Sequence, residues 1–217
     1  MTIAHPRMRA IVLAGLACSS LTLSTQASAA LVTDWSYVTT SVFVPEAVAF
    51  NAGTGVTAVS ATEISWGFET GDFTSPSGLP WENRSALTIG TGTVGDERLG
   101  GGVVTGTMVT DLDGGLPLNP GEIGPGMSVS HWNNPILSAF SMLNTGQVLS
   151  TLTLTPLSPA GADYAPPPLT IDFRFLETPN DAQPCAGGTA NPCGDLFGIF
   201  GFGNFNHVFN YAGIDYH

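Results

Sequence analysis

The sequence predicts an all-β protein, and within that class an antiparallel β-sandwich with a jelly-roll-like path. Several short segments alternate apolar and polar residues with a period of two, which is typical of strands with one face on a core. Clusters of glycine and proline separate these segments, and no stretch has a convincing long-helix pattern. Because each apolar strand face needs a covering layer and no helix is available, we expect a second sheet to supply it.

The clearest strand covers residues 169–175, where four apolar residues at alternate positions face one side and polar residues face the other. The same alternation, or a composition rich in β-branched and aromatic residues, predicts the other strands. Residues 136–143 are compatible with a short helix. The further strands are expected at 34–44, 62–68, 85–89, 103–110, 149–155, 196–202 and 206–211.

The first 29 residues have the pattern of a signal peptide. Two arginines precede a short apolar stretch at 11–17, and residues 27–29 match a small-x-small cleavage site. We expect cleavage before Ala30, with cleavage before Leu31 as the alternative. We expect no membrane span in the mature chain, because the apolar stretch is too short to cross a bilayer. Lipidation at Cys18 is the alternative, although a lipoprotein signal carries leucine where this chain has Gly15. The expected location is periplasmic, cell-surface or extracellular.

The mature chain, residues 30–217, is long enough to form one domain with a buried core. It contains three arginines and no lysine against 17 acidic residues, so its net charge is −14. This charge argues against nucleic acid and anionic membrane surfaces as partners. It is compatible with calcium or with basic partners.

Two cysteines remain in the mature chain, Cys185 and Cys193, and an exported protein normally joins such a pair as a disulfide. The residues between them are typical of a turn and can bring the two ends together. A metal site is the weaker alternative, because zinc usually takes four protein ligands with tighter cysteine spacing.

Several short motifs, in this order, resemble those of the THxN family of PEP-CTERM proteins. They are Ser-Trp-Gly at 65–67, Ser-His-Trp-Asn-Asn-Pro-Ile at 130–136, Leu-Thr-Leu-Thr-Pro at 152–156, Phe-Leu-Glu-Thr-Pro-Asn at 175–180, and Cys-Gly-Asp-Leu-Phe at 193–197.

Members of that family are exported proteins of Gram-negative bacteria that make exopolysaccharide, and the family implies no known catalytic activity. The resemblance therefore implies a non-enzymatic envelope or matrix protein, with extracellular polysaccharide or envelope components as partners. Two features depart from the family pattern. Ser130 replaces the threonine of the naming motif, and no C-terminal Pro-Glu-Pro sorting signal is found. Surface anchoring is therefore not carried over, and we expect either a truncated or a secreted variant.

The motif at 130–136 is the first candidate site, through Ser130, His131, Asn133 and Asn134. In a strand His131 and Asn133 would share one face and Ser130 would face away, which disfavours a serine–histidine catalytic pair. The favoured hypothesis is that His131 and Asn133 are buried and satisfy loop backbone groups. Ligand binding through His131 and Trp132 is the second hypothesis, and catalysis is the third.

A second candidate is the segment Thr110-Asp-Leu-Asp-Gly-Gly115. Asp111 and Asp113 could bind calcium through carboxylate oxygens if a third oxygen ligand converged on them. An ordinary turn is the favoured interpretation, because Asp-Gly is a common turn sequence. Calcium is the one cofactor that the sequence leaves open.

Three further hypotheses concern binding, catalysis and assembly. Trp81 lies in a predicted loop, where an exposed ring could stack on a sugar. Asp172 and Glu177 would make the chain a carbohydrate-active hydrolase if they faced one cleft, although we expect no enzymatic activity. Residues 196–217 would permit self-association if they left a sheet edge unpaired.

Overall fold

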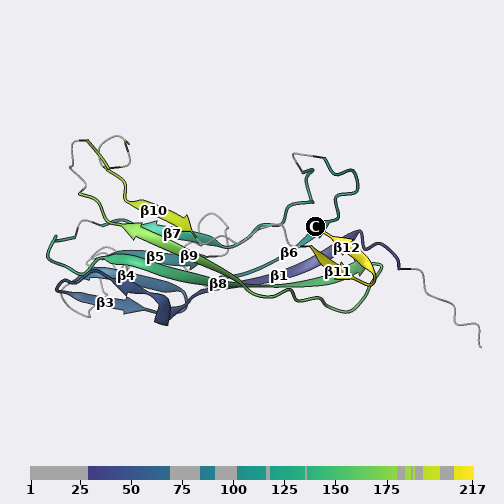
Figure 1. Cartoon of the computed structure of the whole chain (residues 1–217), viewed down its shortest axis with the longest axis horizontal. Helices are drawn as coiled ribbons and strands as arrows, with labels where there is room; N and C mark the ends of the chain where they lie inside the picture. The colour runs from purple at the N-terminus through teal and green to yellow at the C-terminus, as the bar shows by residue number, and fades with distance from the viewer. Residues whose placement is uncertain are drawn as a thin grey trace, which may run out of the picture.

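The structure is a computed structural model. It describes residues 29–68, 84–90, 102–115, 118–134, 136–179, 184–186, 188, 193–200 and 208–217. These residues form an elongated, all-β, antiparallel sandwich, which confirms the predicted fold class (Figure 1). Within them the one helical segment is a 3-10 turn, η1, at Pro45–Ala47. No helix in this described part of the chain is long and apolar enough to cross a membrane.

One large sheet runs the length of the molecule, with strand order β10-β9-β8-β1-β6 and β2 added beside β8. Its longest strand, β8, contacts both ends of the sandwich, and β8, β9 and β10 follow one another as an antiparallel meander. The strands are β1 (Asp34–Phe43), β2 (Ala49–Phe50), β6 (Gly102–Val109), β8 (Leu143–Ser158), β9 (Leu169–Leu176) and β10 (Leu196–Phe200).

Two smaller sheets cover the same face of the large sheet, which we call the inner face. The odd-numbered residues of β1 belong to this face, and they reach one core through Phe43 and another through Trp35. At one end lies a four-stranded sheet of order β3-β4-β5-β7, and at the other a two-stranded hairpin, β11-β12. The strands are β3 (Val56–Val59), β4 (Glu63–Phe68), β5 (Ser85–Gly90), β7 (Ser128–Trp132), β11 (Phe209–Tyr211) and β12 (Ile214–Tyr216).

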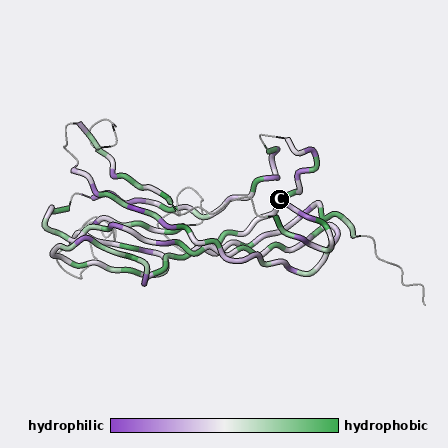
Figure 2. Tube along the Cα trace, in the orientation of Figure 1, coloured by the Kyte–Doolittle hydropathy of each residue, from purple (hydrophilic) through white to green (hydrophobic). Residues whose placement is uncertain are grey.

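We call the region under the four-stranded sheet the disulfide end and the region under the hairpin the hairpin end. Both contain apolar clusters, and Figure 2 shows hydrophobic residues in the strands of both. The core of the disulfide end contains Phe43, Ile64, Trp66, Leu87, Ile89, Leu143, Val148, Phe173 and Phe175. The core of the hairpin end contains Val32, Trp35, Tyr37, Val104, Leu154 and Tyr216.

Most of the predicted strands are present, but the structure differs in three places. The segment predicted at 149–155 is the middle of the 16-residue β8. Residues 136–142 contain a turn and an isolated bridge instead of a short helix, and Leu143 already belongs to β8. The short strands β2, β3 and β12 were not predicted, because two to four residues carry too little alternation to be recognised. Strand β7 was considered only as one possible state of the 130–136 motif, and the structure shows it as a strand.

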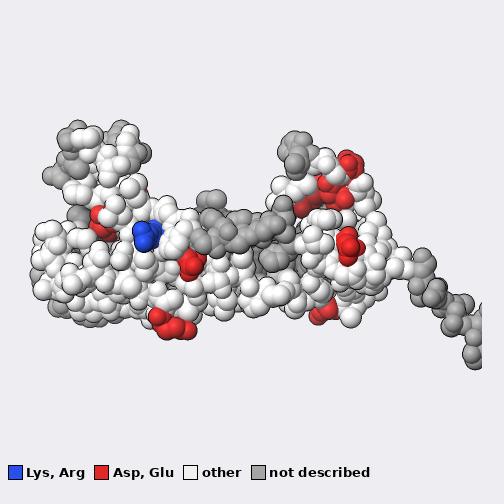
Figure 3. Space-filling model, viewed as in Figure 1, with Lys and Arg blue, Asp and Glu red and all other residues white. Residues whose placement is uncertain are grey.

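The space-filling view shows acidic side chains distributed over both ends and little basic surface on this face (Figure 3). This distribution agrees with the excess of acidic residues in the sequence. The proposed signal peptide, Trp81 and Arg98 lie outside the described residues, apart from Ala29 at the end of the signal.

Candidate functional site

Four segments that are far apart in the sequence meet at the disulfide end. Strand β4 brings Trp66, β7 brings His131, the end of β9 brings Glu177, and the residue before β10 is Asp195. The indole Nε1 of Trp66 donates a hydrogen bond of 3.0 Å to Glu177 Oε2. His131 Nε2 lies 3.6 Å from Asp195 Oδ2. We call these four residues, together with Thr178, the polar cluster.

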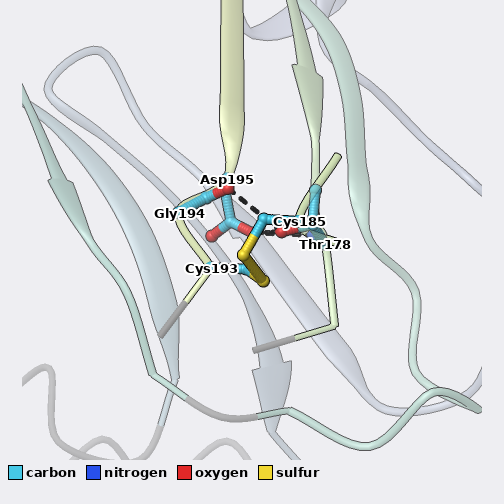
Figure 4. The surroundings of a disulfide bond; sticks show 5 residues. All are labelled: Thr178, Cys185, Cys193, Gly194 and Asp195. Carbon is cyan, nitrogen blue, oxygen red and sulfur yellow. Dashed lines mark hydrogen bonds between the residues drawn. A yellow bond between two sulfur atoms is a disulfide. The ribbon is translucent and has the colours of Figure 1, made fainter. Parts of the chain in front are cut away.

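The predicted disulfide is present and lies beside the polar cluster. Cys185 and Cys193 are bonded, with their Cα atoms 5.3 Å apart. Thr178 donates from its backbone N–H to Asp195 Oδ1 at 2.7 Å and from its hydroxyl to the Gly194 carbonyl at 3.1 Å (Figure 4). The disulfide and these two hydrogen bonds therefore hold the start of β10 against the end of β9.

Two aromatic rings flank the imidazole of His131, whose side chain is 25% exposed. The Trp66 ring lies parallel to the imidazole with centroids 6.1 Å apart, and the Phe175 ring meets it edge-on at 4.8 Å. Burial lowers the pKa of His131, and the nearby Asp195 carboxylate opposes that effect. Neither His131 Nε2 nor Asp195 Oδ2 has a hydrogen-bond partner among the described residues, so these two buried atoms face each other.

Glu177 has the most perturbed acidity in the cluster. Burial and the charge of Asp195 raise its pKa to about 7, although the hydrogen bond from Trp66 opposes the rise. A carboxyl group that titrates near neutrality can act as a general acid, so the arrangement contains groups suited to proton transfer. It also fits a structural role, because Trp66 donates a hydrogen bond to the Glu177 carboxyl group and Thr178 donates one to the Asp195 carboxyl group.

A proton-transfer role requires that a substrate can reach the polar cluster, whereas a structural role does not. The Asp195 side chain is only 1% exposed, and its Oδ1 atom is already occupied by Thr178. Three of the grooves lined by described residues lie elsewhere, and none of these three has His131, Glu177 or Asp195 in its lining. Glycoside hydrolysis needs two carboxyl groups that face a cleft, and the described grooves provide no such cleft at this cluster.

The other residues of the 130–136 motif have separate roles. Asn134 donates from its side chain to the Arg84 carbonyl at 2.7 Å, so Asn134 is the amide that holds a loop backbone group. Asn133 is exposed, and the prediction that it is buried is therefore wrong. The strand ends at Trp132, so the alternation that would have turned Asn133 inward does not continue.

Ser130 and Trp132 lie on the face of β7 opposite to His131, as expected for alternating strand positions. The indole Nε1 of Trp132 donates to Thr88 Oγ1 at 2.9 Å across the β5–β7 pair. Trp132 is half-buried, and its indole N–H is occupied by the protein itself.

The glycine of the Ser-Trp-Gly motif has a clear steric reason. Gly67 has a φ of +81°, and a Cβ atom placed on it would lie 2.3 Å from Ile136 Cγ2. Any other residue would be strained and would also clash with the last residue of the 130–136 motif. Gly67 therefore allows the two motifs to pack together beside Trp66.

The acidic turn lies at the hairpin end, away from the polar cluster. Asp111 Oδ1 accepts backbone hydrogen bonds from Asp113 at 2.9 Å and from Gly114 at 2.8 Å. The bond from Gly114 is the main reason that the pKa of Asp111 is lowered. Glu122, which we did not predict as a partner, brings a carboxylate oxygen within 4.8 Å of one from each aspartate. The turn thus has three converging carboxylates, each of which also accepts bonds from its own loop.

A groove of about 770 Å³ crosses the inner face beside the hairpin end. Its floor comes from β1 and β8, and one wall comes from the hairpin and the loop before β9. Tyr164 and Phe209 stack in this wall with centroids 4.7 Å apart. Hydroxyl-bearing residues of the lining are Tyr37, Thr39, Ser150, Thr151 and Tyr164, and apolar ones include Leu152, Leu154, Leu169, Pro166 and Pro167.

Comparisons of this chain with protein-family models, with curated proteins and with solved structures give no match.

The sequence did not identify Asp195 as the residue that faces His131. It also did not identify Thr178 as the residue that donates a hydrogen bond to Asp195. The two segments are more than 60 residues apart, and each looks like ordinary loop sequence when taken alone. A usable signal was present in the order of the motifs, because four of the five segments that carry the family resemblance surround the polar cluster.

Proposed function

We propose that this chain is an exported, non-enzymatic protein of the cell envelope or extracellular matrix, associated with exopolysaccharide. In this proposal the polar cluster is a structural clasp that holds the two sheets and the disulfide loop together. The observation that carries the structural role is the burial of Asp195, whose side chain is 1% exposed while both of its oxygens face groups of the protein. The disulfide and the resemblance to the THxN family support the exported location.

The groove on the inner face is the surface that we assign to polysaccharide. Sugars present apolar C–H faces and hydroxyl groups, and they are bound by aromatic rings together with hydrogen-bonding side chains. Tyr164 and Phe209 supply rings, and Thr39 and Ser150 supply hydroxyls. Among the described lining residues none is Asp, Glu, Lys or Arg, and His217 is the one histidine, which suits a neutral stretch of a glycan chain.

A retention assay on insoluble polysaccharides and native matrix tests this proposal. Thr39→Arg places a large side chain in the groove, and Val38→Arg places the same residue on the opposite face of β1 as a matched control. We expect wild type and Val38→Arg to be retained on the polysaccharide, and we expect the retained amount of Thr39→Arg to be at least tenfold lower. Trp81→Ala reports on the predicted loop ring in the same assay. Failure of wild type to bind any of these materials would overturn the association with polysaccharide.

A carbohydrate-active hydrolase is the second candidate, because Glu177 titrates near neutrality beside Asp195. Release of reducing sugar from the same polysaccharides tests it. Activity in wild type that Glu177→Gln abolishes, while the variant stays folded, would favour the hydrolase over the structural role.

A calcium-stabilised carbohydrate-binding module is the third candidate, because Glu122 joins Asp111 and Asp113 within ligand distance. Thermal unfolding with calcium or with a chelator tests it. Calcium bound only by the native state would raise the melting temperature as its concentration rises, and Asp111→Asn should remove that rise.

A further inference from the structure

Strand β10 is the most exposed edge of the described sheets. All five of its residues are exposed, although four of them are apolar. The exposed fractions are 38% for Leu196, 41% for Phe197, 46% for Ile199 and 42% for Phe200. Within the described residues β10 pairs with β9 alone, so its second edge presents backbone groups that no described strand uses.

The opposite margin of the same sheet is treated differently. Strand β6 also pairs with one strand, but beyond it the loop at 118–126 returns, and Val109 donates to the Gly121 carbonyl at 2.7 Å. Natural sheet edges are usually protected by charges, proline, bulges or a covering loop. Residues 196–200 contain no charge and no proline, and their pairing with β9 has no bulge.

We propose that β10 pairs antiparallel with β10 of a second copy of this chain, about a two-fold axis at Gly198. The sequence Leu-Phe-Gly-Ile-Phe is symmetric in character about its central glycine. In that register Phe197 lies opposite Ile199 of the second copy, and Leu196 lies opposite its Phe200. Every side-chain pair is then apolar, as a self-complementary two-fold interface requires.

Local crowding and charge favour this register. A Cβ atom at Gly198 would meet no described atom within 4 Å, so a side chain such as cysteine fits at this position without a clash. Each copy carries a large negative charge, and two such copies can approach only through a surface that is locally neutral. Strand β10 itself has no charged residue. Among its neighbours, Arg174 lies 5.6 Å from the Phe200 ring centroid, Asp172 is the β9 residue paired with Phe200, and Asp195 directly precedes the strand. In Figure 3 basic and acidic side chains both appear beside the place that Figure 1 gives to β10.

The dimer is expected to be weak and closed. Five paired residues bury less area than a stable complex normally does, so the dissociation constant should lie in the micromolar to millimolar range. Among the described strands β10 is the one such edge, and the two-fold axis uses it on both copies, so assembly stops at two chains. Salt screens the repulsion between the acidic copies, so the dimer should tighten between 20 and 500 mM NaCl, about tenfold.

Cysteine cross-linking tests the register directly, with protein expressed from its full sequence. Gly198→Cys places two thiols opposite each other at a separation that an antiparallel pair and a disulfide both allow. Val103→Cys, on the other edge strand of the same sheet, is 51% exposed and serves as the matched control. We expect at least tenfold more covalent dimer from Gly198→Cys, with the new bond joining residue 198 of both copies in a peptide map.

Sedimentation velocity tests the interface without a cross-link. We expect a monomer–dimer equilibrium for wild type, at least tenfold weaker association for Ile199→Glu, and a change of less than twofold for Val103→Glu. Circular dichroism checks that both variants remain folded. A wild type that stays monomeric to 1 mM, a dimer unaffected by Ile199→Glu, or equal cross-linking of the two cysteine variants would each overturn the proposal. Binding of β10 to another protein without self-association would also overturn it.

Discussion

The two ends of the sandwich cover one sheet by different means. At the disulfide end a four-stranded sheet, a disulfide and a cluster of polar side chains lie over the inner face. At the hairpin end two strands of three residues each cover the inner face, and aromatic rings pack beneath them. The rings of Tyr211 and Tyr216 meet Trp35 edge-on at 5.4 and 5.3 Å.

The difference shows how a two-stranded hairpin can be stabilised on a large sheet. Two strands of three residues are too short to be stable alone, so the hairpin depends on ring contacts and on one buried hydrogen bond from Val32 N to the Tyr216 hydroxyl. The disulfide end has enough strands to be stable, and its polar residues fix how the segments are arranged. The motifs that carry the family resemblance lie mainly at this end.

The largest expected difference comes from the two buried tryptophans. Trp66→Ala should lower the free energy of unfolding by about 3–5 kcal/mol, because it leaves a large cavity and removes the donor to Glu177. Trp35→Ala removes a ring of similar burial, but its effect should be confined to the hairpin. Urea unfolding measures the first effect, and hydrogen exchange measures the second.

Hydrogen exchange should show lost protection throughout the sandwich for Trp66→Ala and chiefly at residues 208–217 for Trp35→Ala. If both variants lose protection everywhere, the two ends are one cooperative unit and the comparison fails.

Removal of the disulfide should have the next largest effect. The double variant Cys185→Ser, Cys193→Ser opens a short loop, which should cost about 2–3 kcal/mol of unfolding free energy. Chemical denaturation of the oxidised protein, the reduced protein and the double variant measures this cost. The hairpin end should keep its hydrogen-exchange protection, and a loss there would show that the disulfide also supports the distant end.

A smaller effect is expected from the hydroxyl of Tyr216. Tyr216→Phe leaves the buried Val32 N–H without its acceptor, which should cost about 1–2 kcal/mol. Tyr211→Phe removes an exposed hydroxyl that donates to the Ala162 carbonyl, and it should cost less than about 0.5 kcal/mol. Thermal unfolding of the two variants measures the difference, and equal costs would argue against a special role for the buried bond.

The smallest effect concerns pH at the disulfide end. Folding raises the pKa of Glu177 from 4.5 to about 7. Between these two pH values the carboxyl group is protonated in the native state and ionised in the unfolded state. Glu177 therefore makes the unfolding free energy fall as pH rises from about 4.5 to 7. Glu177→Gln keeps an acceptor for Trp66 and removes the charge. Above pH 7 the unfolding free energy of Glu177→Gln should therefore exceed that of wild type by about 1 kcal/mol. This value is reduced because Glu177 is partly exposed and solvent screens its charge.

His131 works in the opposite direction. Its lowered pKa makes the unfolded state bind more protons below pH 6.5, so its contribution to stability is lost as pH falls below that value. Unfolding curves of wild type and Glu177→Gln between pH 4 and 9 separate the two contributions. If the two proteins stay equally stable across that range, Glu177 is ionised without cost and the account of its pKa is wrong.

Local patterns made much of the fold predictable. Alternation identified β9 because four apolar residues stand at every second position, and the spacing of Cys185 and Cys193 identified the disulfide. Short elements escaped for a physical reason. Strand β12 has three residues and is held by rings from β1 and β11, so its stability lies in contacts distant in sequence.

The candidate site was predictable only in part. The sequence singled out His131, but the partner expected for it was loop backbone and not the carboxylate of Asp195. Glu177 and Asp195 could not be distinguished in the sequence from the other acidic residues of the chain. Which of them meets the histidine depends on how β9, β10 and β7 come together, and alternation within one strand carries no information on that.

His131→Gln tests the central claim, that the polar cluster is a clasp and not a ligand or reaction site. The measurement compares wild type and His131→Gln for unfolding free energy and for retention on polysaccharide, with each retention value divided by the folded fraction. Loss of the imidazole removes the ring that Asp195 Oδ2 faces and that packs against Trp66 and Phe175, so we predict a variant less stable by about 1–2 kcal/mol with unchanged retention. Unchanged stability together with lost retention, or with lost hydrolysis, would contradict the account and place His131 in a functional site.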